Sequence, residues 1–90
     1  MRLQLQRIVQ ADDRPEWDRW ARFEACDGAG GRVGFVAEER EWLGHTYGPA
    51  TFTAVHNPTG EAWGARWRSE GHATAAEALA ALAEHLDGAQ

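Results

Sequence analysis

Hydrophobic and polar residues alternate along the first ten positions of the chain. Leu3, Leu5 and Val9 lie at odd positions, with Gln4 and Gln6 among the polar residues between them. Side chains of a strand point to opposite faces in turn, so this period of two is typical of a half-buried strand. Ile8 breaks the alternation near its end. The pattern predicts an N-terminal strand.

The next segment, DDRPEWDRWARFEACDG, fits two kinds of element. As a helix it offers Asp13 as N-cap and Pro15 in the first turn. As a strand it alternates and leads, through DGAGG, into a second strand, RVGFVAE. Its aromatic residues scatter around a helical wheel, so we favour the hairpin over the helix for residues 14–26. The hairpin puts these residues on one face: Trp17, Ala21, Phe23, Ala25, Val33, Phe35 and Ala37.

The segment ATFTAVHNPTGEAWGARWRS has the clearest hairpin pattern in the chain. Asn57, Pro58, Thr59 and Gly60 suit a type I turn with glycine in the left-handed position. With a bulge at Gly60, Val55 faces Trp63, and the tryptophans face the helix. The residues then expected on the other face are Phe52, Ala54, Arg66 and Arg68. A slip by one residue would instead put Phe52 with the tryptophans.

The last element is a helix predicted over residues 74–87. Thr74 is the N-cap and Glu77 completes a capping box. His85 lies near the negative end of the helix dipole, and Gly88 follows the helix. One stripe carries Ala75, Leu79, Leu82 and Leu86. The chain is therefore expected to be one α+β domain over residues 1–90, a mostly antiparallel sheet of about five strands with this helix across one face.

Composition narrows the function classes. The net charge is −5, and all nine basic residues are arginine. Such a chain lacks the general positive field that attracts nucleic acid or anionic membranes. Cys26 is the one cysteine and cannot form an internal disulfide, and the N-terminus lacks the apolar run of a signal peptide. We expect a cytoplasmic location and no membrane partner.

Residues that could carry chemistry do not form a recognisable pattern. The four histidines, at positions 45, 56, 72 and 85, lack the helical spacing of paired metal ligands. Cys26 lies beside Glu24 and Asp27, which raise a thiol pKa rather than lower it. Adjacent carboxylates diverge on extended backbone, and the glycine-rich GAGGRVG precedes no helix. We expect no enzyme activity, no cofactor, no metal site and no small-molecule ligand.

The segment EEREWLGHTYGP reads as a loop, with room for one helical turn at its start. Its aromatic residues either fold over the open sheet face or form an exposed contact surface. We predict the second, in a small accessory, adaptor or inhibitor-type protein of bacterial or phage kind. Its partner is another protein, with a second copy of the chain (a homodimer) as one option. The residues predicted to bind are Trp20, Trp42, Leu43, Tyr47, Glu38, Glu39 and Glu41.

An alternative is a small nucleic-acid-binding regulator. It would use Phe52, Arg66 and Arg68 as a cationic and aromatic surface on one face of the hairpin. Glu61 and Glu70 border these arginines, and two arginines make a small basic footprint. The balance of charge therefore favours a protein partner.

Overall fold

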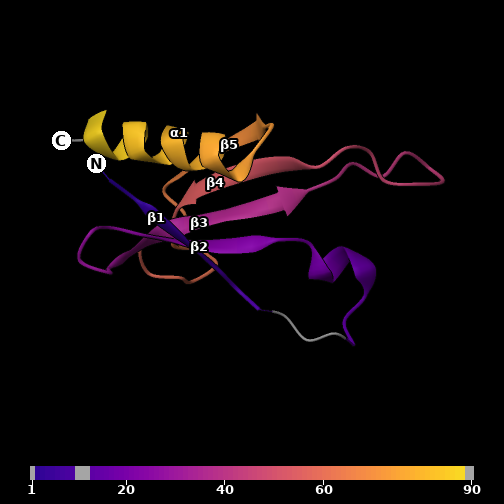
Figure 1. The fold of residues 1–90 in the computed structure, drawn as a ribbon, viewed down its shortest axis with the longest axis horizontal. Helices are drawn as coiled ribbons and strands as arrows, with labels where there is room; N and C mark the ends of the chain where they lie inside the picture. Colours follow the sequence, from indigo (N-terminus) through magenta and orange to yellow (C-terminus); the bar gives the residue numbers. More distant parts are fainter. Residues whose placement is uncertain (1, 10–12, 89–90) are drawn as a thin grey trace.

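Five antiparallel strands form one sheet, and a single helix packs across one of its faces (Figure 1). The structure, a computed structural model, describes residues 2–9 and 13–88, and of Glu16 its backbone alone. The strands are β1 (Gln4–Arg7), β2 (Arg22–Cys26), β3 (Arg32–Glu39), β4 (Thr51–His56) and β5 (Trp67–His72), in that order across the sheet. The helix α1 spans Ala75–Gly88 and packs mainly on β4 and β5. The predicted α+β class is confirmed.

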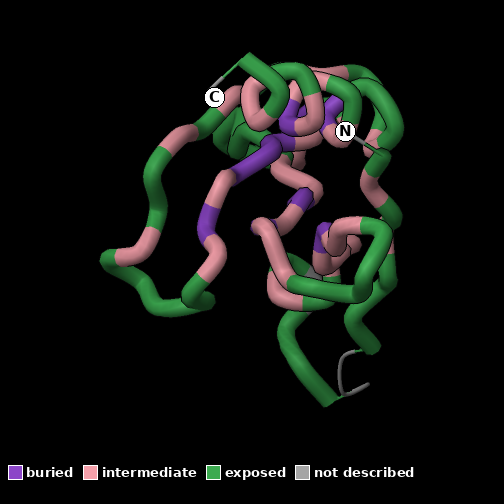
Figure 2. The backbone as a smooth tube through the Cα atoms, turned by 90° about the vertical axis from the view of Figure 1, so that its left-hand side faces the viewer, coloured by how far each residue is buried: buried purple, intermediate pink, exposed green. Residues whose placement is uncertain are grey.

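The pairing of the strands decides which residues face the helix. Phe23 lies opposite Val36, and Val36 lies opposite Ala54, so these three side chains share one face. The buried core between that face and α1 consists of Ala25, Val36, Ala54, Ala78 and Leu82. Figure 2 shows buried stretches in the strands and the helix, while the long connections are mostly exposed. Most of these core side chains are small, so the large aromatic residues lie around the core rather than in it.

The helix begins as the sequence predicts. The backbone N–H of Glu77 donates to Thr74 Oγ1 at 3.1 Å, and Glu77 Oε2 accepts from the backbone N–H of Ala73 at 3.1 Å. These two bonds satisfy donors that have no partner within the helix. Leu82 is fully buried, and the rest of the predicted stripe packs against the core. Within the described residues, no helix is both long enough and apolar enough to cross a bilayer.

The N-terminal half follows neither simple interpretation. Leu3 and Leu5 pack toward the core, but Val9 lies beyond β1 and is exposed. A short 3₁₀ helix occupies Glu16–Arg19, and β2 begins at Arg22. The segment is thus part helix and part strand. Pro15, rather than Asp13, precedes the helical turn, which has no side-chain cap.

Val33 packs against the core as predicted, but the predicted register of the first hairpin is wrong by one residue over the rest of β3. Phe35 lies opposite Glu24 and Ala37 opposite Arg22, on the face away from the helix. Val36 takes the core position instead. The cause is an irregularity between Ala25 and Cys26, which shifts the pairing by one residue.

The predicted register of the second hairpin is also wrong. His56 pairs with Trp67, so a long loop, not a tight turn, joins β4 to β5. Asn57 holds this loop, because its Oδ1 accepts from Gly60 N–H at 3.0 Å and its Nδ2 donates to the Glu61 carbonyl at 2.8 Å. Gly60 does take the predicted left-handed conformation, with φ +78°. Trp63 lies in the loop and is 81% exposed rather than facing the helix.

Candidate functional site

Residues 40–50 form an arm that extends the β3–β4 hairpin beyond the sheet. The backbone N–H of Leu43 donates to the Thr46 carbonyl and that of Gly48 to the Glu41 carbonyl, both at 2.8 Å. Trp42 pairs with Tyr47 across the arm, and Gly44 turns the chain with φ +96°. The arm lies at one end of a molecule that measures 44 × 25 × 23 Å (Figure 1). The helical turn considered for the start of this segment is absent from it.

Three aromatic rings, Trp20, Tyr47 and Trp42, form a cluster in which Tyr47 contacts the other two; this set is called the aromatic cluster. Trp20 meets Tyr47 edge to face with ring centroids 4.8 Å apart, and Trp42 meets Tyr47 in the same manner at 5.0 Å. The Arg40 guanidinium lies 5.9 Å from the Trp20 ring centroid. Edge-to-face pairs contribute about 0.5–1.5 kcal/mol each beyond burial. The cluster therefore fixes the conformation of the arm.

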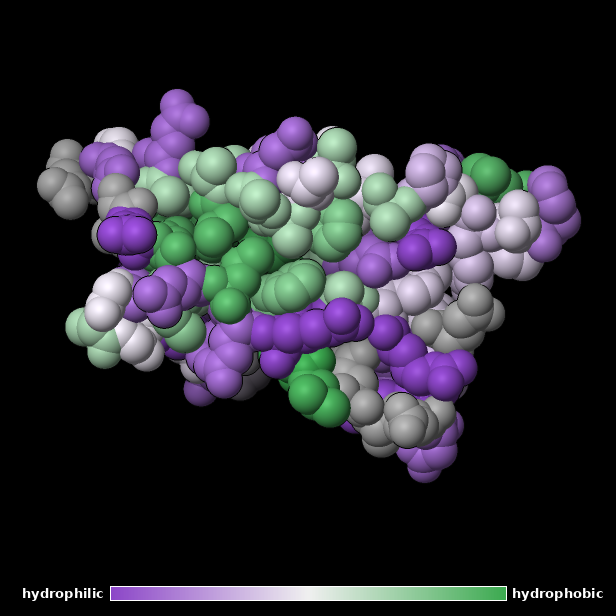
Figure 3. Space-filling model, viewed as in Figure 1, coloured by the Kyte–Doolittle hydropathy of each residue, from purple (hydrophilic) through white to green (hydrophobic). Residues whose placement is uncertain are grey.

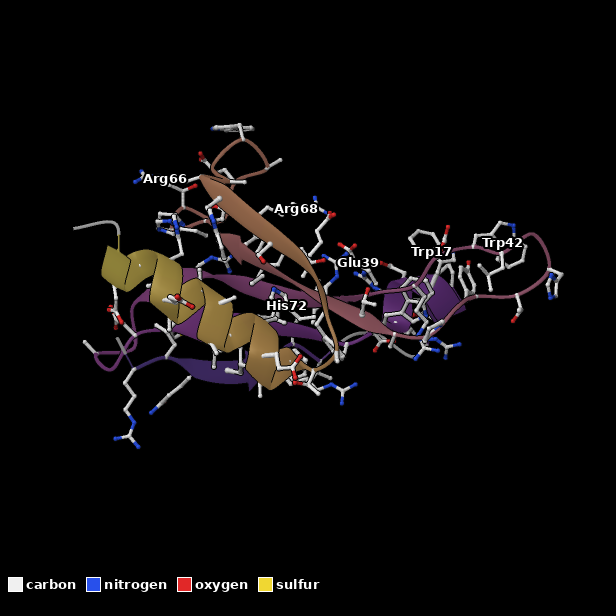
Figure 4. The ribbon with its side chains drawn as sticks, turned by 90° about the horizontal axis from the view of Figure 1, so that it is seen from above. Trp17, Glu39, Trp42, Arg66, Arg68 and His72 are labelled. Atoms are coloured by element: carbon white, nitrogen blue, oxygen red, sulfur yellow. The ribbon has the colours of Figure 1, made fainter. Side chains whose placement is uncertain are left out.

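Much of this apolar material faces water. Trp42 is 57% exposed and Leu43 is 50% exposed, while Trp20 and Tyr47 are half-buried. Trp17 is also 57% exposed and lies at the same end of the molecule as Trp42 (Figure 4). The four aromatic and aliphatic residues predicted to bind, Trp20, Trp42, Leu43 and Tyr47, are thus brought together.

The position of Trp17 differs from the one that its sequence pattern predicts. The favoured hairpin put it on an inward strand face, whereas it belongs to the 3₁₀ helix before β2. Pro15 was the available signal, because proline favours the first turn of a helix.

The predicted acidic residues have different surroundings. Glu38 accepts from Arg40 Nε at 2.6 Å and from the Ala21 N–H at 3.3 Å, and so supports the base of the arm. Glu39 pairs with Arg68 at 3.1 Å. Glu41 is exposed, and no ion pair of the described residues involves it. Of the three, Glu41 offers its charge most fully to a partner.

Phe52, Arg66 and Arg68 do not form one surface. Phe52 lies opposite His72 and packs against the core, whereas Arg68 lies opposite Val55 on the other face of the sheet. The expectation that they share a face is wrong, because β5 begins later than predicted. Arg68 also pairs with Glu39, which lies beside it in Figure 4, and at 2.7 Å with Glu70. Nucleic-acid binding stays a prediction of the sequence alone.

Cys26 and the histidines lie apart from the arm, except for His45 in the arm itself. Partial burial raises the pKa of the Cys26 thiol, and Glu24, at 3.5 Å, raises that pKa further. His85 stacks on Trp67 with ring centroids 4.3 Å apart, and His56 lies 5.4 Å from His85. His72 instead contacts Ser69 Oγ at 2.8 Å. Across residues 2–9 and 13–88, no three His, Cys, Asp or Glu side chains are placed to hold a metal ion.

The chain was compared with known proteins in three ways. No protein-family model, no curated protein sequence and no solved structure matches it.

Proposed function

We propose that this protein is a small non-enzymatic interaction module that docks on another protein through the tip of its arm. The observation that carries this proposal is the exposure of Trp42 and Leu43 on a hairpin fixed by ring contacts. Tryptophan and tyrosine dominate the energetics of protein interfaces because they bury large areas with few rotatable bonds.

Preorganisation supports the same proposal. Ordering a flexible loop on binding costs free energy, and a surface already fixed avoids much of that cost. Trp42 is held by Tyr47, and Tyr47 in turn by Trp20. The arm therefore presents its exposed side chains in one arrangement before a partner arrives.

Charge indicates the kind of partner. Glu41 lies next to Trp42, and the molecule carries a net charge of −5. An acidic surface speeds encounter with a basic one and discriminates against acidic partners. We infer a partner protein with an apolar groove for Trp42 and Leu43 and a basic border around that groove. An accessory, adaptor or inhibitor role on a larger assembly fits this chemistry.

The test is comparative capture from nuclease-treated lysate with three baits: the parent protein, Trp42→Ala combined with Leu43→Ala, and Trp63→Ala. Trp63 is the matched control, because it is 81% exposed but lies in the β4–β5 loop. We expect one partner to be retained by the parent and by Trp63→Ala and lost by the arm variant. With purified partner, the arm variant should raise Kd at least about 30-fold, since central tryptophans contribute at least about 2 kcal/mol.

Two results would overturn the proposal. One is capture of the same proteins by the arm variant and the parent. The other is no captured protein at all with the parent bait.

A further inference from the structure

One face of the sheet is wider than the helix that covers it. Five strands about 4.8 Å apart place the outer strands about 19 Å from each other, whereas a helix is about 10 Å wide. Here α1 packs mainly on β4 and β5 and less extensively on β3. On the same side, β2 buries Ala25 fully, but Leu5 of β1, Phe23 of β2 and Leu3 just before β1 are only partly buried. Among residues 2–9 and 13–88, no second helix covers this half of the sheet.

A groove of about 540 Å³ lies between α1 and the N-terminal strand. Its lining includes Leu3 on one side and Ala76, Leu79, Ala80 and Ala83 on the other. Figure 3 shows hydrophobic side chains gathered beneath the helix on this side of the molecule. The alanines leave the side of α1 without bulky groups, so another helix could approach within about 8 Å of its axis.

The borders of the groove carry opposite charges. Arg2 lies on the β1 side, and Glu84 and Asp87 lie on the helix side. In the described part of the chain, neither Arg2 nor Glu84 takes part in an ion pair. In a two-fold dimer, each contact between residues of the two copies occurs twice. A surface with one basic and one acidic border is therefore complementary to itself.

We propose that this groove is the interface of a homodimer. The α1 helix of a second copy packs against Ala76, Ala80 and Ala83, and Arg2 of each copy faces Glu84 of the other. A second copy carries the complementary arrangement of charges already. The arm lies at the far end of the molecule, so the dimer presents two arms (Figure 1). This inference is independent of the function proposed for the arm.

The first test is sedimentation equilibrium of the protein from micromolar concentrations up to about 100 µM. We expect a mass twice the 10.0 kDa of one chain at the upper end. Ala80→Glu puts a charge in the groove at a position where glutamate still favours helix, and should raise the dimer dissociation constant at least about tenfold. Ala65→Glu is the matched control, since Ala65 is exposed in the β4–β5 loop, and it should dimerise like the parent.

A charge exchange provides a second test that does not depend on the fold of one variant. Arg2→Glu and Glu84→Arg should each weaken the dimer a few-fold, and the double variant should restore it, because the pair is remade with the signs reversed. A monomer at about 100 µM would refute the proposal. So would a dimer that Ala80→Glu leaves unchanged, or one that only Trp42→Ala dissociates, because that contact would belong to the arm.

Discussion

His56 lies where its charged form is disfavoured. Its Nδ1 atom is buried and, among the described residues, has no hydrogen-bond partner. Burial lowers the pKa of His56 from its ordinary value of 6.5, and the charges of His85 on α1 and of Arg66 in the β4–β5 loop lower it further. The stacked ring of Trp67 fixes the position of His85 beside it. The folded protein therefore prefers a neutral imidazole at this position.

This lowered pKa predicts how stability changes with pH. Below about pH 6.5 the unfolded chain binds a proton that folded His56 resists, so the free energy of unfolding falls as the pH is lowered. Above that value both states are neutral, and the stabilising effect is complete. Urea unfolding of the parent and of His56→Gln between pH 7.5 and 5 measures how the free energy of unfolding changes with pH. We expect this free energy to fall less in the variant than in the parent over this range.

His45→Gln is the control for that experiment, since His45 lies exposed in the arm. It should follow the parent across the same pH range. If the free energy of unfolding fell equally with pH in all three proteins, His56 would be protonated as easily in the folded state as in the unfolded chain.

Single residues also limit what sequence reasoning could predict. The residues from Trp63 to Trp67 alternate as the residues of a strand do, yet only Trp67 belongs to a strand. The difference arises at Asn57, whose side-chain amide replaces backbone pairing and holds a longer loop open. Gly64 belongs to the same arrangement, because a Cβ there would overlap Thr59 Oγ1. Such contacts depend on three-dimensional placement that no period along the chain reveals.

Among the elements, α1 is the one whose signals all agree. Its cap, its capping box and its apolar stripe are local features, so the sequence predicts its start within one residue. The number of strands and the antiparallel pairing within the two hairpins were predicted, but their register was not. Register depends on the irregularity at Ala25 and Cys26 and on the loop after β4, and each of these shifts the pairing without changing the local pattern.

The helix cap supports an element-scale prediction. Thr74→Ala removes the oxygen that accepts from Glu77 N–H at 3.1 Å. Loss of an N-cap costs about 1 kcal/mol, which lowers Tm by about 4–8 °C in a domain of this size. Thermal unfolding followed by circular dichroism measures the change. Thr74→Ser keeps the oxygen and should stay within about 2 °C of the parent; equal losses in the two variants would assign the effect to something other than the cap.

At the scale of the whole molecule, the chain divides into a body and an arm. The body consists of the sheet and α1, and its core residues all lie outside residues 40–50. The sequence predicted that Trp20, Trp42, Leu43 and Tyr47 would form one contact surface, because a solvent-exposed loop does not need such large apolar side chains. It could not predict that they project from one end. That outcome follows from Trp42 pairing with Tyr47, a contact made only when both sides of the arm are extended.

This division predicts that the body folds without the arm. Glu39 lies opposite Thr51 at the end of β3, so Asn-Gly can replace residues 40–50 as a two-residue hairpin turn. The shorter loop reduces the free-energy cost of loop closure by about 1.5 kcal/mol, which stabilises the fold. Each lost ring contact destabilises the fold by about 0.5–1.5 kcal/mol. These effects nearly cancel, so Tm should change by less than about 8 °C and the far-ultraviolet spectrum should keep its helical signal.

The shortened protein should lose the partner that the parent captures and still dimerise through the groove beside α1. Unfolding of this variant would instead make the aromatic cluster part of the core, and the exposed rings of the arm would then need no partner to explain them.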